Sequence, residues 1–211
     1  MKAYKKTLII TILITLLPCF VGLLLWDRLP EQIPTHFNFN NEVDGYSSKP
    51  LAVFGIPLMM VFFQLVCAFA TFNDPKKKHI NSKLIHLILF IIPGCSVFIV
   101  ILSYGTALGY PVNTGMLSNL MVGLIFLVIG NYMPKVKQNY TMGIKLPWTL
   151  DNEQNWNKTH RLAGWLWIIG GILLLGNAVL RSGLLLLAVI FLTTAIPGIY
   201  SFLLYQKEKT N

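Results

Sequence analysis

The stretch that decides the fold class covers residues 84–104 and reads LIHLILFIIPGCSVFIVILSY. It contains no Asp, Glu, Lys or Arg, and Lys83 directly precedes it. The hydrocarbon core of a bilayer is about 30 Å thick, so a helix needs roughly 20 consecutive apolar residues to cross it. Because no water reaches the backbone there, a run of this length must satisfy its own polar groups within a helix. The stretch therefore predicts a transmembrane α-helix.

Five more uncharged apolar runs lie on either side of this one, at residues 7–26, 51–72, 115–133, 162–180 and 183–205. The composition agrees, since 55% hydrophobic and only 12% charged residues leave too little charge to cover a soluble globule of 211 residues. Each run is about twice as long as a membrane-barrel strand. We therefore expect an all-α integral membrane protein, a bundle of six transmembrane helices that forms a single compact membrane domain.

The runs also suggest how this domain is organised. Residues 1–72 would form an N-terminal helix pair with an external loop, and residues 73–211 a four-helix remainder that carries a cytoplasmic loop. The first run follows lysines as a signal peptide does, but it continues past the usual apolar core and ends without a cleavage motif. We expect it to be a retained anchor.

The lysines and arginines predict the orientation, because short loops rich in these residues stay in the cytoplasm. Fourteen of the 17 lie on one side of the expected membrane: Lys2, Lys5, Lys6, Lys76, Lys77, Lys78, Lys83, Lys135, Lys137, Lys145, Lys158, Arg161, Lys207 and Lys209. The opposite side holds Arg28, Lys49 and Arg181, together with the acidic residues Asp27, Glu31, Glu42 and Asp44. Both termini are therefore expected in the cytoplasm, and the net charge of +9 indicates membrane orientation rather than nucleic-acid binding.

Polar residues inside the spans leave two interpretations open. Charged side chains within spans usually mark ion pathways, and these spans have none, so an ion-coupled transporter is disfavoured. Gln64, Asn119 and Asn177 do lie within spans, where an amide needs a partner. They either join neighbouring helices or line the polar pocket of a small-molecule permease or exporter.

Enzyme chemistry finds little support in the sequence. No nucleophile signature surrounds His160, and the chain has neither a phosphate-binding glycine loop nor a zinc-binding histidine pair. The three cysteines lie in apolar runs without metal-ligand spacing. We therefore expect no catalytic residues, no metal and no cofactor. A membrane-bound enzyme remains a further alternative, and it would need His36 or His160 as an essential base.

The external loop covers about residues 27–50. Its prolines favour extended backbone and Asp44-Gly45 is a turn signal, so a small hairpin or a pair of extended strands is expected. His36 and Asp44 lack a third metal ligand at suitable spacing, and an acidic, aromatic lip for a peptide or a lipid headgroup fits better. The candidate ligand-binding residues are His36, Phe37, Asn38, Asp44, Gly45 and Tyr46.

The cytoplasmic loop covers about residues 134–161. Asp151 followed by Gln154 resembles an N-cap with its capping partner and predicts a helix that runs into the fifth span. On that helix Trp156, His160 and Ala163 share one face, since they are three to four residues apart. We expect the segment to be a membrane-surface helix anchored by Trp and Lys, a protein-docking surface, or both, since neither role excludes the other.

These two loops resemble the SdpI family of bacterial immunity and signalling membrane proteins. The external loop reads LPEQIPTHFN at residues 29–38, followed by Asp44-Gly45, and Phe37 stands where this external-loop domain often has Trp. The cytoplasmic loop reads NYMPK at 131–135, GIKLPWTL at 143–150 and WNKTHR at 156–161. The likeness extends over nearly the whole chain.

The resemblance implies a multi-pass protein of the bacterial cytoplasmic membrane that gives resistance to a secreted antimicrobial peptide toxin. It also implies a receptor role, in which the toxin-bound protein holds a cytosolic winged-helix autorepressor at the membrane. The partners would be the lipid bilayer, the toxin and the repressor, with no direct contact to nucleic acid. The motif residues implied for partner docking are Asn131, Pro134, Lys135, Asn139, Gly143, Lys145, Pro147, Trp148, Trp156, Thr159, His160 and Arg161.

Overall fold

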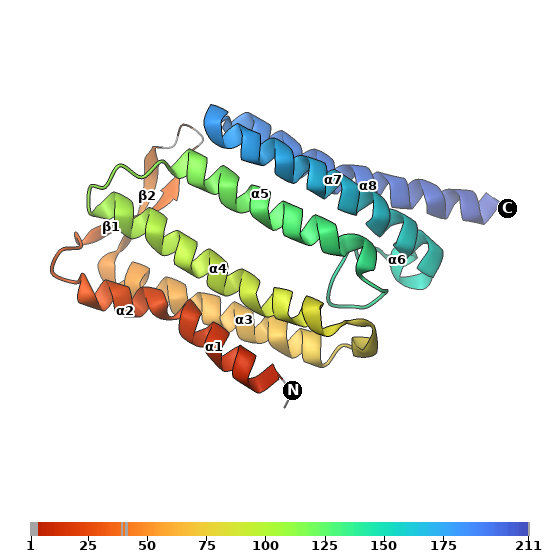
Figure 1. Ribbon diagram of the computed structural model, residues 1–211, viewed down its shortest axis with the longest axis horizontal. Coiled ribbons are helices and arrows are strands. Elements are labelled where there is room, and N and C mark those ends of the chain that lie inside the picture. The colour runs from red at the N-terminus through yellow and green to blue at the C-terminus, as the bar shows by residue number, and fades with distance from the viewer. Residues whose placement is uncertain (1–3, 39, 41, 211) are drawn as a thin grey trace. The chain divides into compact units, whose positions relative to one another are not determined.

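The computed structural model describes residues 4–38, 40 and 42–210 and confirms the predicted all-α fold with six transmembrane helices (Figure 1). Lys2, one of the orienting lysines, lies outside the described residues. By length and composition, six helical segments of the described chain can cross a membrane: Lys5–Leu24, Leu51–Phe72, Ser82–Ala107, Thr114–Lys135, Glu153–Leu180 and Gly183–Thr210. An even number of spans puts both ends on one side, as the charge distribution predicts.

The spans and their connections are built from helices, short helical turns and one hairpin. In chain order they are α1 (Lys5–Thr15), α2 (Leu17–Leu24), β1 (Gln32–Phe37), β2 (Val43–Ser48), the π-helical turn η2 (Leu51–Gly55), α3 (Ile56–Phe72), the 3-10 turn η3 (Lys77–His79), α4 (Ser82–Ala107), α5 (Thr114–Tyr132), the 3-10 turn η4 (Met133–Lys135), α6 (Pro147–Asp151), α7 (Glu153–Leu180) and α8 (Gly183–Thr210).

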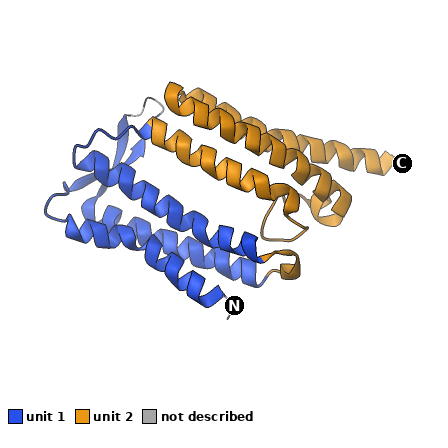
Figure 2. Ribbon diagram, viewed as in Figure 1, with its two compact units in different colours: residues 1–73, 82–114 blue, residues 74–81, 115–211 orange. Residues whose placement is uncertain are grey.

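The helices pack into two compact units (Figure 2). Unit 1 comprises residues 1–73 and 82–114, so the third spanning helix, α4, packs with the first two spans. Unit 2 comprises residues 115–211 together with residues 74–81, the short connector between α3 and α4. The division into residues 1–72 and 73–211 stays a prediction.

The expected hairpin is confirmed in unit 1, but Asp44-Gly45 does not form its turn, because both residues lie within strand β2. Strands β1 and β2 pair antiparallel, with Gln32 opposite Ser48, and the register shifts on both sides of His36. Ile33 is fully buried and packs with Val53 and Tyr104 at the ends of the spanning helices. The apolar face of β1 thus fixes the hairpin to unit 1 and leaves its other face free.

A polar lock joins three helices of unit 1. Pro93 in α4 has no N–H, so the Leu89 carbonyl four residues earlier loses its helical donor. The Gln64 amide of α3 donates to that carbonyl (3.4 Å), and Gln64 Oε1 accepts a hydrogen bond from the Thr15 hydroxyl at the end of α1 (2.7 Å). All of this is buried, with Gln64 only 1% exposed. The proline in α4 therefore explains why a glutamine is placed in the middle of α3.

The same arrangement recurs in unit 2. Pro197 in α8 frees the Thr193 carbonyl, and the Trp167 indole N–H of α7 donates to it (3.1 Å). Nearby, the Asn177 amide donates to Asn119 Oδ1 (2.8 Å) and so joins α7 to α5. The three amides that the sequence placed inside spans are Gln64, Asn119 and Asn177. Each bonds a partner within its own unit, which supports their interpretation as joints between helices.

The polar lock generates a prediction about stability. Gln64→Leu leaves the Leu89 carbonyl without a donor, so the free energy of unfolding should fall by about 1 kcal/mol. In a Pro93→Ala background the alanine N–H can donate to this carbonyl, and Gln64→Leu should then cost clearly less. Reversible unfolding in mixed detergent, followed by circular dichroism, measures all four proteins. An equal loss in both backgrounds would contradict the pairing of Gln64 with the proline.

Candidate functional site

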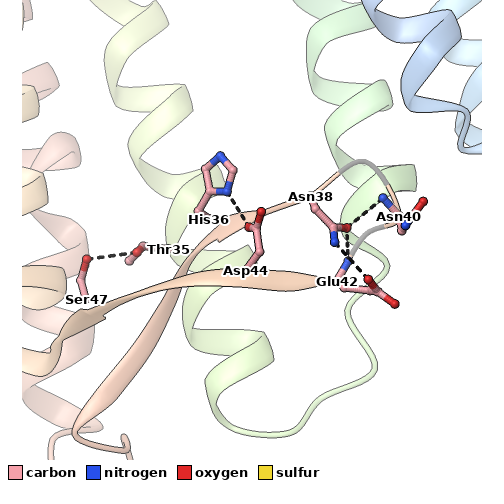
Figure 3. Close-up of polar contacts among 7 residues, drawn as sticks. All are labelled: Thr35, His36, Asn38, Asn40, Glu42, Asp44 and Ser47. Atoms are coloured by element: carbon pink, nitrogen blue, oxygen red, sulfur yellow. Dashed lines mark hydrogen bonds and ion pairs between the residues drawn. The ribbon is translucent and has the colours of Figure 1, made fainter.

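Three of the six predicted hairpin residues are exposed, and two of these, His36 and Asp44, contact one another (Figure 3). His36 Nδ1 lies 2.6 Å from Asp44 Oδ1, with 73% and 41% of the two side chains exposed. Such an exposed pair contributes at most about 1 kcal/mol and requires a protonated imidazole to be ionic. Tyr46 is 59% exposed, whereas Phe37 and Gly45 are half-buried. The exposed lip therefore consists of His36, Asp44 and Tyr46.

Asn38 organises the turn of the hairpin. Its Oδ1 accepts the backbone N–H of Asn40 (2.8 Å) and of Glu42 (3.0 Å), and its Nδ2 donates to the Glu42 carboxylate (3.0 Å) (Figure 3). Its amide is thus engaged in shaping the turn. Among the described residues, no group of three or more His, Cys, Asp or Glu side chains is arranged to hold a metal ion.

Residues 136–146, which we call the motif loop, are held against α7 by an aromatic pair. Trp156 and His160 stack with ring centroids 4.0 Å apart, and at most 1% of either residue is exposed. The Trp156 indole N–H donates to the Val136 carbonyl (2.7 Å), and the Ile144 N–H donates to His160 Nε2 (2.9 Å). One stacked pair on α7 therefore binds both ends of the motif loop.

The bonds of His160 define its protonation. Nδ1 lies 2.8 Å from the Trp156 carbonyl and can only donate to it, while Nε2 accepts from Ile144. This arrangement requires the neutral ring with its proton on Nδ1, because a proton on Nε2 would face the Ile144 N–H. His160 thus serves as a structural acceptor, and its lone pair is occupied.

Gly143 makes the close approach of loop and helix possible. Its φ is +112°, in a region that side-chain-bearing residues rarely adopt. A Cβ at this position would overlap His160 Nε2 and lie 2.9 Å from carbons of the Trp156 ring. A residue larger than glycine would therefore push the loop away from α7.

Asn139, in the centre of the motif loop, is 1% exposed. Its Oδ1 accepts the N–H groups of Thr141 (2.9 Å) and Met142 (2.7 Å), and its Nδ2 donates to the Lys137 carbonyl (2.8 Å). The side chain therefore substitutes for the secondary structure that the loop lacks.

Asp74 and Gln138 also hold the motif loop in place. Neither was among the motif residues predicted from the sequence. Asp74 is 4% exposed, and its Oδ2 accepts from the Tyr140 N–H (2.8 Å) and the Thr141 hydroxyl (2.6 Å). Gln138 accepts from the Lys76 ammonium and donates to the Leu150 carbonyl (2.7 Å). One signal for Asp74 was present, because it is the only acidic residue in the basic connector that follows the second span.

Two interpretations of the cytoplasmic loop are wrong. The cap of α7 is Asn152, whose side chain accepts the Asn155 N–H (2.9 Å), because Asp151 ends the separate short helix α6. Trp156 is not a membrane-surface anchor, because it is fully buried and its N–H is bonded within unit 2. Trp148 is half-buried as well, and its indole N–H donates to the Ser201 hydroxyl of α8 (3.0 Å).

The predicted motif residues thus divide into two sets. Those that build the loop are buried or half-buried: Asn139, Gly143, Trp148, Trp156, Thr159 and His160. Those that remain exposed are Asn131, Pro134, Lys135, Lys145, Pro147 and Arg161. The exposed set contains three positive charges and no negative charge, so the surface available to a partner is basic.

The fold and these two loops define a class of protein. It is a helical multi-pass membrane protein with a hairpin in one unit and an ordered motif loop in the other. The model of the SdpI/YfhL protein family matches residues 135–201, and that of a domain of unknown function, DUF1648, matches residues 13–61. The immunity protein SdpI of Bacillus subtilis (strain 168) is 27% identical over 209 residues, which cover 96% of this chain and 97% of that protein. No solved structure matches. Both comparisons thus relate the chain to the SdpI family, the family model over residues 135–201 and the immunity protein over nearly the whole chain.

The fit of Gly143 against α7 generates a prediction about loop order. Gly143→Ala combines backbone strain of about 1–3 kcal/mol with a steric overlap, so the Ile144–His160 bond should break. Trypsin should then cut faster after Lys137 and Lys145 in membranes whose cytoplasmic face is accessible. Gly176→Ala on α7 is the matched control, since a Cβ there meets open space. Equal cleavage of the two variants would show that the loop tolerates a side chain at residue 143.

Proposed function

We propose that the chain is an immunity protein that protects its cell from a secreted antimicrobial peptide toxin acting at the membrane. The observation that carries this proposal is the similarity to an immunity protein over 96% of the chain, which includes both loops. A second support is the placement of polar chemistry. The apolar runs of the spans contain no Asp, Glu, Lys or Arg, and the candidate residues gather at the two membrane faces.

The toxin site that we propose is the exposed lip of the hairpin, formed by His36, Asp44 and Tyr46. The lip combines a carboxylate, an imidazole and a phenol on a rigid base, because buried Ile33 anchors the strand beneath it. A carboxylate favours a positively charged segment of the peptide, and an exposed tyrosine offers apolar area with little entropy to lose.

We further propose that the protein acts as a receptor whose motif loop holds a cytosolic winged-helix autorepressor at the membrane. The exposed motif residues Lys135, Lys145 and Arg161 are basic, so the partner surface would be acidic. Toxin binding transmits a signal only if it favours one of two arrangements of the protein, since a ligand indifferent to both shifts nothing.

The immunity proposal is tested by expressing the chain in a toxin-sensitive bacterium and exposing it to the peptides encoded beside its gene. The wild-type chain should allow growth at peptide concentrations that kill cells carrying the empty vector. His36→Ala with Asp44→Ala should abolish protection while the membrane still contains the protein. Arg28→Ala, an exposed change in the same loop, serves as the control and should protect fully. Unchanged killing by every such peptide would rule out the immunity role.

The receptor proposal needs a separate readout. Lys135→Ala and Arg161→Ala should keep protection but reduce the amount of repressor that sediments with membranes after toxin is added. If the repressor sediments equally with wild-type and double-variant membranes, the exposed basic motif residues do not hold the repressor.

A further inference from the structure

Helix α3 is bracketed by two buried charges. Among the described residues, Lys49 (6% exposed) and Asp74 (4%) are the only Lys, Arg, Asp or Glu residues that are buried. Lys49 lies two residues before η2, which continues into α3, and Asp74 lies two residues after α3 ends at Phe72. A buried charge is costly unless specific partners hold it. Both ends of this one span are therefore fixed by strong, directional bonds.

The outer end is fixed by Lys49. Its backbone N–H donates to the Glu31 carbonyl (2.9 Å), which continues the pairing of β1 with β2. Its ammonium donates to the Trp26 carbonyl (3.3 Å), lies 2.9 Å from the Glu31 carboxylate and sits over the Trp26 ring. The start of the span is thus tied to both the hairpin and the end of the first span.

The inner end is fixed by Asp74, which bonds the motif loop through the Tyr140 N–H and the Thr141 hydroxyl. Only Asn73 separates Asp74 from α3. Asn73 is itself tied to the helix, because its backbone N–H and its side-chain amide both donate to the Phe69 carbonyl (3.0 and 2.8 Å). One residue spans 3.8 Å at most, so the connection has almost no slack.

We propose that α3 is the rod that transmits the state of the external hairpin to the cytoplasmic motif loop, with Lys49 and Asp74 as its two attachment points. A ligand that moves the hairpin shifts or rotates α3, and the shift pulls the Asp74 carboxylate away from the motif loop. The loop then loses two of the bonds that order it and changes what it presents to a partner. The inference rests on the proposed function only for the nature of the ligand.

The experiment is hydrogen–deuterium exchange on the full chain in nanodiscs of phosphatidylethanolamine and phosphatidylglycerol, read at residues 32–48 and 136–146. Coupling between two sites is reciprocal. Lys49→Ala should therefore raise exchange in the motif loop by about fivefold, and Asp74→Ala should raise exchange in the hairpin by a similar factor. The milder Lys49→Arg and Asp74→Asn should raise exchange at the same opposite ends of α3 by a smaller factor. These variants keep the test valid if an alanine variant fails to fold.

Two exposed charges provide matched controls. Arg28→Ala lies in the external loop and Asp151→Ala in the cytoplasmic loop, and neither should change exchange at the opposite end of α3. A sharper control inserts two glycines between Asn73 and Asp74. Asp74 can then still bond the motif loop, but the slack should abolish the effect of Lys49→Ala on that loop.

The proposal is overturned if each substitution changes exchange only at its own end of α3, or if Lys49→Ala still opens the motif loop after the glycine insertion. Because this readout uses no toxin and no repressor, it is independent of the immunity assay. Failure of that assay would leave the transmission by α3 standing, and failure here would leave the immunity role standing.

Discussion

The absence of water inside the bilayer is the constraint on which the rest of this structure depends. Every backbone N–H and C=O within the hydrocarbon needs a protein partner, so the spans are helical. Pro93 inside α4 and Pro197 inside α8 show the constraint at work. Each frees one carbonyl, and each freed carbonyl receives a side-chain donor from a neighbouring helix, Gln64 in one unit and Trp167 in the other. The positions of Gln64 and Trp167 thus follow from where these two prolines stand.

The same constraint keeps charged side chains out of the apolar runs and confines them to the segments outside these runs. Two of these segments are the ordered loops. The loops are ordered by different means. The hairpin uses strand pairing and one buried face, whereas the motif loop depends on buried side chains that replace secondary structure. Both modes leave a small exposed set of residues, one of them acidic and aromatic, the other basic.

Most of the predicted motif residues that are buried serve to pack the loop rather than to contact a partner. Trp156, His160 and Gly143 interlock so closely that none can change alone without disturbing the others. A substitution at any of them would therefore disorder the loop and so change its exposed residues indirectly. Changes at exposed Lys135 or Arg161 are the ones that separate recognition from folding, since Lys145 also donates to the Tyr140 and Thr141 carbonyls of the motif loop.

The sequence by itself determined the number of spans, the expected orientation and the presence of a hairpin, because run length, loop charge and prolines that favour extended backbone act locally. It misplaced the turn at Asp44-Gly45, which the structure puts within β2. It also found the helix face shared by Trp156 and His160, since helical periodicity is local too. Only the tertiary structure decided that this face points into the protein, that Asn152 caps α7 and that α4 packs with the first two spans. Asp74 and Tyr140 lie far apart in sequence, so their bond has no local signal. Contacts of that kind arise when distant elements pack together, and the residue pattern of a single segment does not predict them.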